Sequence, residues 1–225
     1  DGSNVYLASY FYDVLWDQLR VFSRDQETGT LSGIQEVAEG EGGVRGLVSP
    51  STVDCSPDGR FAYVVASHSL AWFEVSEVDN TVTPVGLYEE TPEEGYVLGY
   101  NADLKVSPQG EFIYVAGGSG CPIIFARETE TGDVNLIPPD ECNPSAIGCD
   151  FLGCTGGFPS SLTFSPDGKN LYGVTWGDGE YEVFAPVFTV YAVDAVDGSL
   201  AVIQADWSAQ CSIDDDGYDE GHCLA

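Results

Sequence analysis

A short phrase recurs along this chain, and it constrains the fold more than any other feature of the sequence. The phrase is Ser-Pro-Asp-Gly or Ser-Pro-Gln-Gly with a Tyr four residues after the Gly, and it occurs at residues 56–63, 107–114 and 165–172. The chain opens inside a fourth copy, in which Tyr6 follows Gly2. Such a constant interval is expected where a tight turn leads into a strand and the Tyr side chain always occupies the same buried position on that strand. We therefore predict equivalent second-strand positions for Tyr6, Tyr63, Tyr114 and Tyr172.

A second fixed interval, of seven residues, joins an aromatic residue to a turn residue in each unit. The pairs are Phe22 and Gly29, Phe73 and Asn80, Phe125 and Gly132, and Tyr191 and Gly198. Because Gly and Asn tolerate positive φ, this interval predicts a hairpin between a third and a fourth strand. Fourth strands are expected at residues 31–37, 82–88, 134–137 and 199–207, and first strands at residues 51–56, 102–107 and 160–165.

Four short antiparallel strands in a unit of roughly 50–60 residues, without helical periodicity, are typical of a propeller blade. We therefore predict an all-β fold, a β-propeller of about four four-stranded blades over residues 1–207. The blades form either a complete four-bladed ring or part of a larger propeller. A β-sandwich would not explain the strict self-similarity of the units.

The first unit lacks its first strand, and the tail of the chain offers a replacement. Residues 210–217 are a degenerate copy of residues 54–59. We interpret residues 208–225 as an acidic, disulfide-stapled tail that supplies a strand, either to its own ring or to a neighbouring chain.

The charge of the chain is strongly negative, since 37 Asp and Glu oppose 7 Lys and Arg and the net charge is -30. Such a surface repels nucleic acid and anionic membranes, which bind proteins through cationic residues. The plain explanation is a solvated acidic coat. The expected partners are other copies of this chain or extracellular proteins.

The sequence holds seven cysteines, none with the spacing of a zinc or redox motif, so a disulfide framework is favoured. We expect Cys211 to pair with Cys223, and two of Cys142, Cys149 and Cys154 to pair with each other. The third of that group would be left for Cys121 or for another chain, and Cys55 would be a free thiol in an apolar strand. This framework predicts an extracellular or cell-surface location.

Few residues in the sequence suggest a catalytic, metal-binding or ligand-binding site. The two histidines are His68, in a predicted loop, and His222, in the tail, and no nucleophile elbow or phosphate-binding Gly loop is present. The tail carboxylates offer closely spaced oxygens of the kind that Ca²⁺ prefers, against the alternative of a solvated tail. They are Asp214, Asp215, Asp216, Asp219 and Glu220. An aromatic insert with Phe11, Tyr12 and Trp16 either binds a sugar or a partner or covers the end of the barrel.

Longer phrases add a resemblance. Residues 56–64 read Ser-Pro-Asp-Gly-Arg-Phe-Ala-Tyr-Val, residues 21–25 read Val-Phe-Ser-Arg-Asp, residues 27–31 read Glu-Thr-Gly-Thr-Leu, and residues 42–47 read Gly-Gly-Val-Arg-Gly-Leu. Over nearly the whole chain these phrases resemble the lactonase-type β-propeller repeat family. That family includes sugar-lactone hydrolases and many secreted repeat proteins, and its best-known members are seven-bladed.

Two functions follow. The missing strand, the odd cysteine, the acidic coat and the lack of a catalytic set favour a non-enzymatic, extracellular structural or interaction module, as a subunit of a larger assembly or filament. The alternative is a lactonase-like hydrolase with an axial carboxylate or metal site. Polar side chains from different blades that converge on one axial pocket would favour the enzyme, and an apolar axis would count against it.

Overall fold

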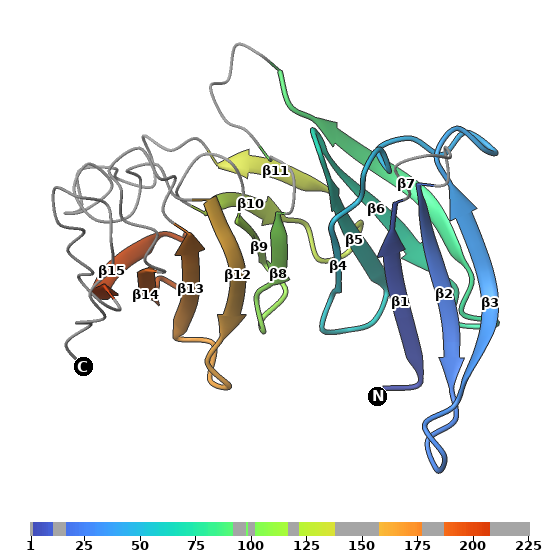
Figure 1. Cartoon of the computed structure of the whole chain (residues 1–225), viewed down its shortest axis with the longest axis horizontal. Coiled ribbons are helices and arrows are strands. Elements are labelled where there is room, and N and C mark those ends of the chain that lie inside the picture. The colour runs from blue at the N-terminus through green and yellow to red at the C-terminus, as the bar shows by residue number, and fades with distance from the viewer. Residues whose placement is uncertain are drawn as a thin grey trace, which may run out of the picture.

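The structure is a computed structural model of the chain, and it describes residues 2–10, 17–91, 98, 102–116, 122–137, 158–176 and 187–207. These residues form four antiparallel sheets, arranged in an arc from the sheet at the N-terminus to the sheet that contains β15 (Figure 1). The described residues include no helix, and so none that is long and apolar enough to cross a membrane.

Each sheet corresponds to one repeated unit. Unit 1 has three strands, β1 (Asn4–Ser9), β2 (Gln18–Arg24) and β3 (Leu31–Ala38). Unit 2 has four, β4 (Thr52–Cys55), β5 (Phe61–Ala66), β6 (Ser69–Val75) and β7 (Val82–Glu89). Unit 3 has β8 (Asp103–Val106), β9 (Phe112–Ala116), β10 (Ile123–Arg127) and β11 (Val134–Ile137). Unit 4 has β12 (Phe158–Phe164), β13 (Asn170–Trp176), β14 (Val187–Val193) and β15 (Leu200–Trp207).

The prediction of an all-β propeller with about four blades is confirmed, and among the described residues unit 1 lacks a first strand, as predicted. The strands also lie close to their expected bounds. The largest shift concerns β12, which begins at Phe158 rather than at residue 160. The tail that was expected to supply the missing strand lies outside the described residues.

The register of the strands confirms the repeat. In each unit the anchor Tyr and the central aromatic residue of the third strand occupy adjacent rungs of one strand pair. Tyr63 pairs with Trp72 and Phe73 with Ala62, and Tyr114 pairs with Ile124 and Phe125 with Ile113. The same positions recur as Tyr6 with Val21 and Phe22 with Val5, and as Tyr172 with Val190 and Tyr191 with Leu171.

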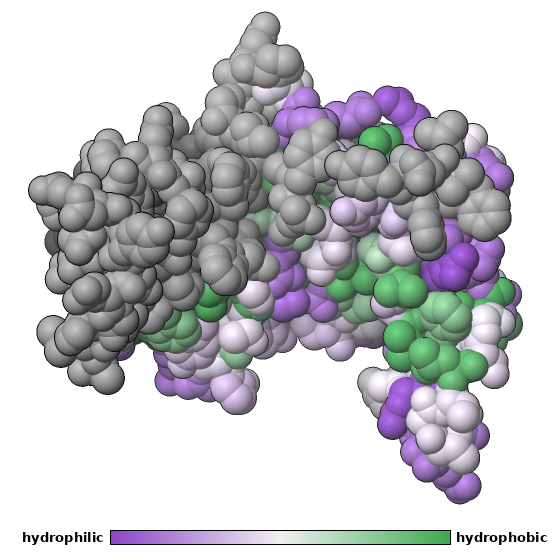
Figure 2. Space-filling model, viewed as in Figure 1, coloured by the Kyte–Doolittle hydropathy of each residue, from purple (hydrophilic) through white to green (hydrophobic). Residues whose placement is uncertain are grey.

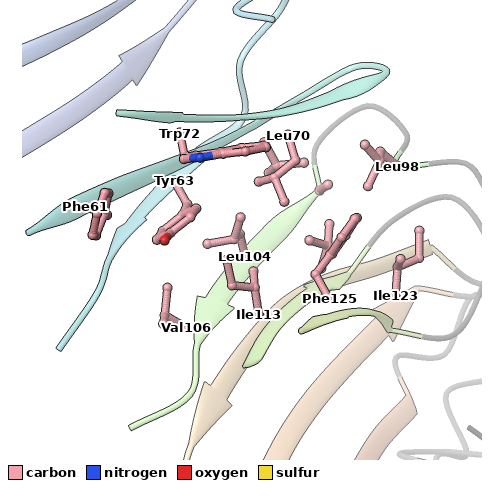
Figure 3. Packing of buried hydrophobic residues seen from close by; sticks show 13 residues of the cluster. Phe61, Tyr63, Leu70, Trp72, Leu98, Leu104, Val106, Ile113, Ile123 and Phe125 are labelled. Carbon is pink, nitrogen blue, oxygen red and sulfur yellow. The ribbon is translucent and has the colours of Figure 1, made fainter. Parts of the chain in front are cut away.

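Among the residues that the structure describes, the core forms three clusters, each between two consecutive units. In the cluster between units 2 and 3, side chains of β5 and β6 face Leu104, Ile113 and Phe125 of unit 3 (Figure 3). Successive side chains of a strand point to opposite faces, so the inner strands of one blade pack against both neighbouring blades. This alternation explains why β5 is buried along its whole length.

The innermost strand of each sheet lines the axis of the arc. β1 contacts β4, β4 contacts β8, and β8 contacts β12. Polar side chains on these short strands therefore lie close together although they come from different units.

Candidate functional site at the propeller axis

An open cavity of about 440 Å³ lies at the axis, where units 1, 2 and 3 meet. Its walls come from the end of β1, the start of β4 and the start of β8. The lining residues are Ala8, Ser9, Tyr10, Pro50, Ser51, Thr52, Ala102 and Asp103. The volume falls within the range of small-molecule sites in proteins.

Three polar side chains from equivalent positions converge beside this cavity. Thr52, Asp103 and Ser161 each lie four residues before the Ser of the repeated phrase, at the start of β4, at the start of β8 and in the middle of β12. The Thr52 hydroxyl donates to Asp103 Oδ1 at 3.4 Å, and the Ser161 hydroxyl donates to Asp103 Oδ2 at 3.3 Å. The Asp103 carboxylate thus stands between two hydroxyl groups from neighbouring blades.

Backbone groups fix the orientation of this carboxylate. Asp103 Oδ1 accepts the N–H of Leu104 at 2.8 Å, and Oδ2 accepts the N–H of Leu162 at 2.7 Å. Only 15% of the Asp103 side chain is exposed. The two backbone hydrogen bonds are short and hold the carboxylate in place, whereas the two hydroxyl contacts are long and weak.

Two further charged groups, Lys105 and Asp54, lie close to Asp103 on β8 and β4. Lys105 Nζ is 3.4 Å from Asp103 Oδ1, and its side chain is 31% exposed. Asp54 accepts the N–H of Val106 at 2.9 Å, which ties unit 2 to unit 3. Burial raises the pKa of the Asp54 carboxyl above its ordinary value, although backbone hydrogen bonds and the Lys105 charge oppose this rise. Two carboxylates and one ammonium group therefore share the axis.

His68 lies in the turn between β5 and β6, as the sequence predicted, and its side chain is 60% exposed. Its Nδ1 contacts a carboxylate oxygen of Glu90, and the other oxygen of Glu90 accepts the N–H of Leu98 at 2.7 Å. His68 does not line the axial cavity. We assign it a structural role in this turn.

The other site residues proposed from the sequence lie outside the described residues. They are Phe11, Tyr12 and Trp16 of the aromatic insert, the tail carboxylates Asp214, Asp215, Asp216, Asp219 and Glu220, and the cysteines Cys142, Cys149, Cys154, Cys211 and Cys223. Calcium binding, the disulfide pairs, the partners and the extracellular location stay predictions. Within the part of the chain that the structure describes, no three His, Cys, Asp or Glu side chains are grouped as metal ligands would be.

Cys55 is a free thiol, as predicted. It packs beside the cluster between units 1 and 2, and burial, with the nearby Asp54 carboxylate, raises its pKa to about 12. A thiol with so high a pKa is a poor nucleophile at neutral pH.

The comparisons with known proteins agree with this architecture. A family described as "Lactonase, 7-bladed beta-propeller" matches residues 8–149. No curated protein matches the sequence. Among solved structures, the chain is similar to a putative 6-phosphogluconolactonase from Bacteroides uniformis, with a TM-score of 0.61, 19% identity, and coverage of 85% of this chain and 49% of that one.

A periplasmic gluconolactonase from Pseudomonas aeruginosa is also similar, with a TM-score of 0.58, 18% identity, and coverage of 89% of this chain and 52% of that one. A protein from Lactobacillus plantarum matches with a TM-score of 0.60 and 21% identity over 85% of this chain and 49% of that one. The chain therefore spans about half the length of these structures. At such low identity the likeness shows the fold alone.

The hypothesis of a structural or interaction module is wrong: the family match supports the alternative, a lactonase-like hydrolase. The sequence misled because Thr52, Asp103 and Ser161 are far apart in the chain and form no contiguous motif. The sequence signal that could have identified these residues is a polar side chain four positions before the Ser of each complete repeated phrase.

Proposed function

The chain belongs to the lactonase family of seven-bladed β-propellers, and on that premise we propose that it contributes the axial site of a hydrolase that opens sugar lactones. The observation that carries this proposal is the convergence of Thr52, Asp103 and Ser161 from three blades beside one cavity. Such convergence is the feature that distinguishes an enzyme from a structural module with an apolar axis.

Asp103 is the proposed general base. Lactone hydrolysis adds a water oxygen to the ring carbonyl, and a carboxylate that takes a proton from this water lowers the barrier. The hydroxyl contacts of Asp103, at 3.3 and 3.4 Å, are long enough to be exchanged for a bound water. The proton taken by Asp103 is later given to the ring oxygen when the carbonyl carbon–oxygen bond of the ring breaks, and the product is an open hydroxy acid.

Lys105 is the proposed electrostatic partner. Negative charge develops on the carbonyl oxygen as water adds, and a positioned cation in a shielded site stabilises that charge. The Lys105 ammonium group lies on the same side of its strand as Asp103 and 3.4 Å from its carboxylate. Its partial burial strengthens the interaction relative to a lysine in bulk water.

The test is the rate of opening of D-glucono-1,5-lactone, followed by pH-stat titration and corrected for spontaneous hydrolysis. We expect the protein to accelerate the reaction, and Asp103→Asn to lower the enzymatic rate by about 10²-fold or more. Lys105→Met should also lower it, because the developing charge loses its cation. A rate that is the same for the protein and for Asp103→Asn would contradict the proposal.

Lys169→Met is the matched control. Lys169 is the other lysine of the chain, its side chain is 79% exposed, and it lies on the turn before β13. Its replacement should leave the rate unchanged. Thermal unfolding of each variant separates loss of chemistry from loss of fold.

A further inference from the structure

Every lysine and arginine of the chain lies among the described residues, and none of them lines the axial cavity. Six of the seven have partners elsewhere. Five form ion pairs, Arg20 with Glu36, Arg45 with Glu89, Arg60 with Glu130, Arg127 with Asp58 and Lys169 with Asp167. Arg24 donates to the carbonyl oxygen of Gly2 at 3.3 Å. Lys105 is the one whose ion pair includes a residue of the cavity lining, Asp103.

The positive charge of Lys105 is already balanced. Its Nζ lies 3.4 Å from Asp103 Oδ1, and the Asp54 carboxyl is close enough to feel both charges. Burial is the main cause of the raised pKa of Asp54; the Asp103 charge adds to the rise, whereas two backbone hydrogen bonds and the Lys105 charge oppose it. These three groups carry a net negative charge when Asp54 is ionised and no net charge when it is protonated. Neither state offers a surplus positive charge to a ligand.

The rest of the cavity lining is uncharged. Ser9, Ser51 and Thr52 supply hydroxyl groups, Tyr10 supplies an aromatic ring that is 43% exposed, and the other lining residues besides Asp103 are apolar. Hydroxyl groups exchange hydrogen bonds with the hydroxyls of a sugar, and an aromatic ring packs against its C–H groups. The lining therefore suits an uncharged polyhydroxy ligand.

A phosphate ester would need different groups. It carries a charge of about -1.5 to -2 at neutral pH, and proteins bind it with Arg or Lys side chains or at a helix N-terminus. The axial lining has no such side chain, and no helix occurs in the described part of the chain. A phosphate group at the axis would meet the carboxylates of Asp103 and Asp54 without a cation of its own.

The charge of the whole chain acts in the same direction. Its net charge is -30, so its surface repels anions as they approach. Figure 2 shows hydrophilic residues at the tip of the hairpin between β2 and β3, where Asp25 and Glu27 lie. An anionic substrate is therefore disfavoured both on approach and at the axis.

We propose that the axial site selects lactones that carry no anionic group and rejects their phosphate esters, because carboxylates at the axis are not outweighed by cations. The inference rests on the proposed lactonase function and adds the class of substrate. Like charges brought together in a shielded site repel strongly, so a single phosphate group on the sugar is enough for rejection.

The test compares kcat/KM for D-glucono-1,5-lactone with kcat/KM for 6-phospho-D-glucono-1,5-lactone. Both reactions release acid, so both are followed by pH-stat titration and corrected for spontaneous opening. At low ionic strength we expect the value for the unphosphorylated lactone to be higher by on the order of 10-fold or more. In about 1 M NaCl, where the screening length falls to about 3 Å, the value for the phosphate ester should rise and the ratio should narrow.

A variant with a new cation in the lining tests the cause. Ser9 lines the cavity at the end of β1 and has no role in the proposed chemistry. Ser9→Arg should raise kcat/KM for the phosphate ester by on the order of 10-fold. Ser9→Gln, the matched control with a long uncharged side chain, should not. Both variants should leave the value for the unphosphorylated lactone nearly unchanged, and thermal unfolding checks that both fold.

The possible outcomes separate this inference from the function on which it rests. If the phosphate ester is opened as fast as the unphosphorylated lactone, the inference is wrong and the proposed function stands. A preference that neither salt nor Ser9→Arg changes would mean that size rather than charge selects the substrate, which also overturns the inference. The salt series uses the unaltered protein, so it decides the matter even if Ser9→Arg does not fold. A protein that accelerates neither reaction would overturn the proposed function and this inference together.

Discussion

The contact between units 2 and 3 and the contact between units 1 and 2 occupy equivalent places in the repeat, yet they are held by different chemistry. Between units 2 and 3, the buried Arg127 donates to the Tyr63 hydroxyl at 2.6 Å and to the Gly110 carbonyl at 2.7 Å, and its guanidinium lies 5.3 Å from the centre of the Phe61 ring. Between units 1 and 2, Asn4 bonds to Asn80, and the Gln35 amide bonds to both backbone groups of Val82.

This difference shows that a propeller repeat fixes backbone register and leaves the polar part of each blade contact free to vary. Both contacts bury a large aromatic residue at the same place, Phe73 in one and Phe125 in the other. The aromatic residue contributes buried apolar surface to each contact. The polar side chains contribute hydrogen bonds that only the right neighbouring blade can complete.

The largest expected effect comes from removing one of these aromatic residues. Phe125→Ala should lower the free energy of unfolding by about 3–5 kcal/mol, because it empties a fully buried site in which Phe125 packs edge-on against Tyr88 with ring centres 5.1 Å apart. The equivalent change Phe22→Ala in unit 1, which has no preceding sheet among the described residues and where the side chain is only partly buried, should cost about 1 kcal/mol. Urea unfolding of both variants measures the difference, and equal losses would contradict the assignment of Phe22 to an uncovered face.

Arg127→Met should come next, with a loss of about 2–4 kcal/mol. The substitution leaves the Gly110 carbonyl without its 2.7 Å donor inside the contact between units 2 and 3. Arg60→Met is the control, since Arg60 is 38% exposed and its ion pair with Glu130 spans 3.7 Å, so the expected loss is below about 1 kcal/mol. If Arg60→Met were as destabilising as Arg127→Met, the buried guanidinium would have no special role.

Gln35→Ala tests the other contact. The Gln35 side chain accepts the Val82 N–H at 2.6 Å and donates to the Val82 carbonyl at 3.1 Å. Its loss should cost about 1–3 kcal/mol, because two backbone groups lose their partner. Thermal and urea unfolding should show this loss in Gln35→Ala but not in Glu36→Ala, whose side chain is 67% exposed. A neutral Gln35→Ala would mean that apolar packing alone holds units 1 and 2 together.

The smallest effect concerns pH and Asp54. Burial raises the pKa of this carboxyl in the folded protein, so the folded state holds its proton at pH values where the unfolded chain has lost it. The contribution of Asp54 to stability is therefore present at low pH and is lost as the pH rises through the raised pKa. The stability of Asp54→Asn relative to the original protein should increase over that interval and then stay constant. A difference that does not change with pH would contradict the raised pKa.

Much of the fold could be predicted from the sequence because it depends on local rules. The Gly-to-Tyr interval sets the turn before the second strand, and the Phe-to-Gly interval sets the hairpin before the fourth. Both depend on a few residues near each other in the chain, such as Gly59 and Tyr63. The pairing of Asn4 with Asn80 could not be predicted, because it joins side chains of different units and the sequence does not state which units are neighbours.

The candidate site was harder to predict for the same reason. Asp103 receives its partners from β4, β8 and β12, and each of these strands contributes only one or two of them. The sequence pointed instead to the acidic tail and the aromatic insert, where residues suited to metal or ligand binding are adjacent in the chain. Burial and the closure of three strands around one axis, rather than local density of charge, bring the site residues together.

The most direct test of the axial site uses the two lysines of the chain, Lys105 and Lys169. Both can be acetylated with acetic anhydride, and mass spectrometry reports the rate at each position separately. If sugar lactones bind at the axis, D-gluconolactam, a lactam analogue that resists hydrolysis, should slow acetylation of Lys105 and leave that of the exposed Lys169 unchanged. Equal acetylation rates at Lys105 with and without saturating lactam would contradict the account.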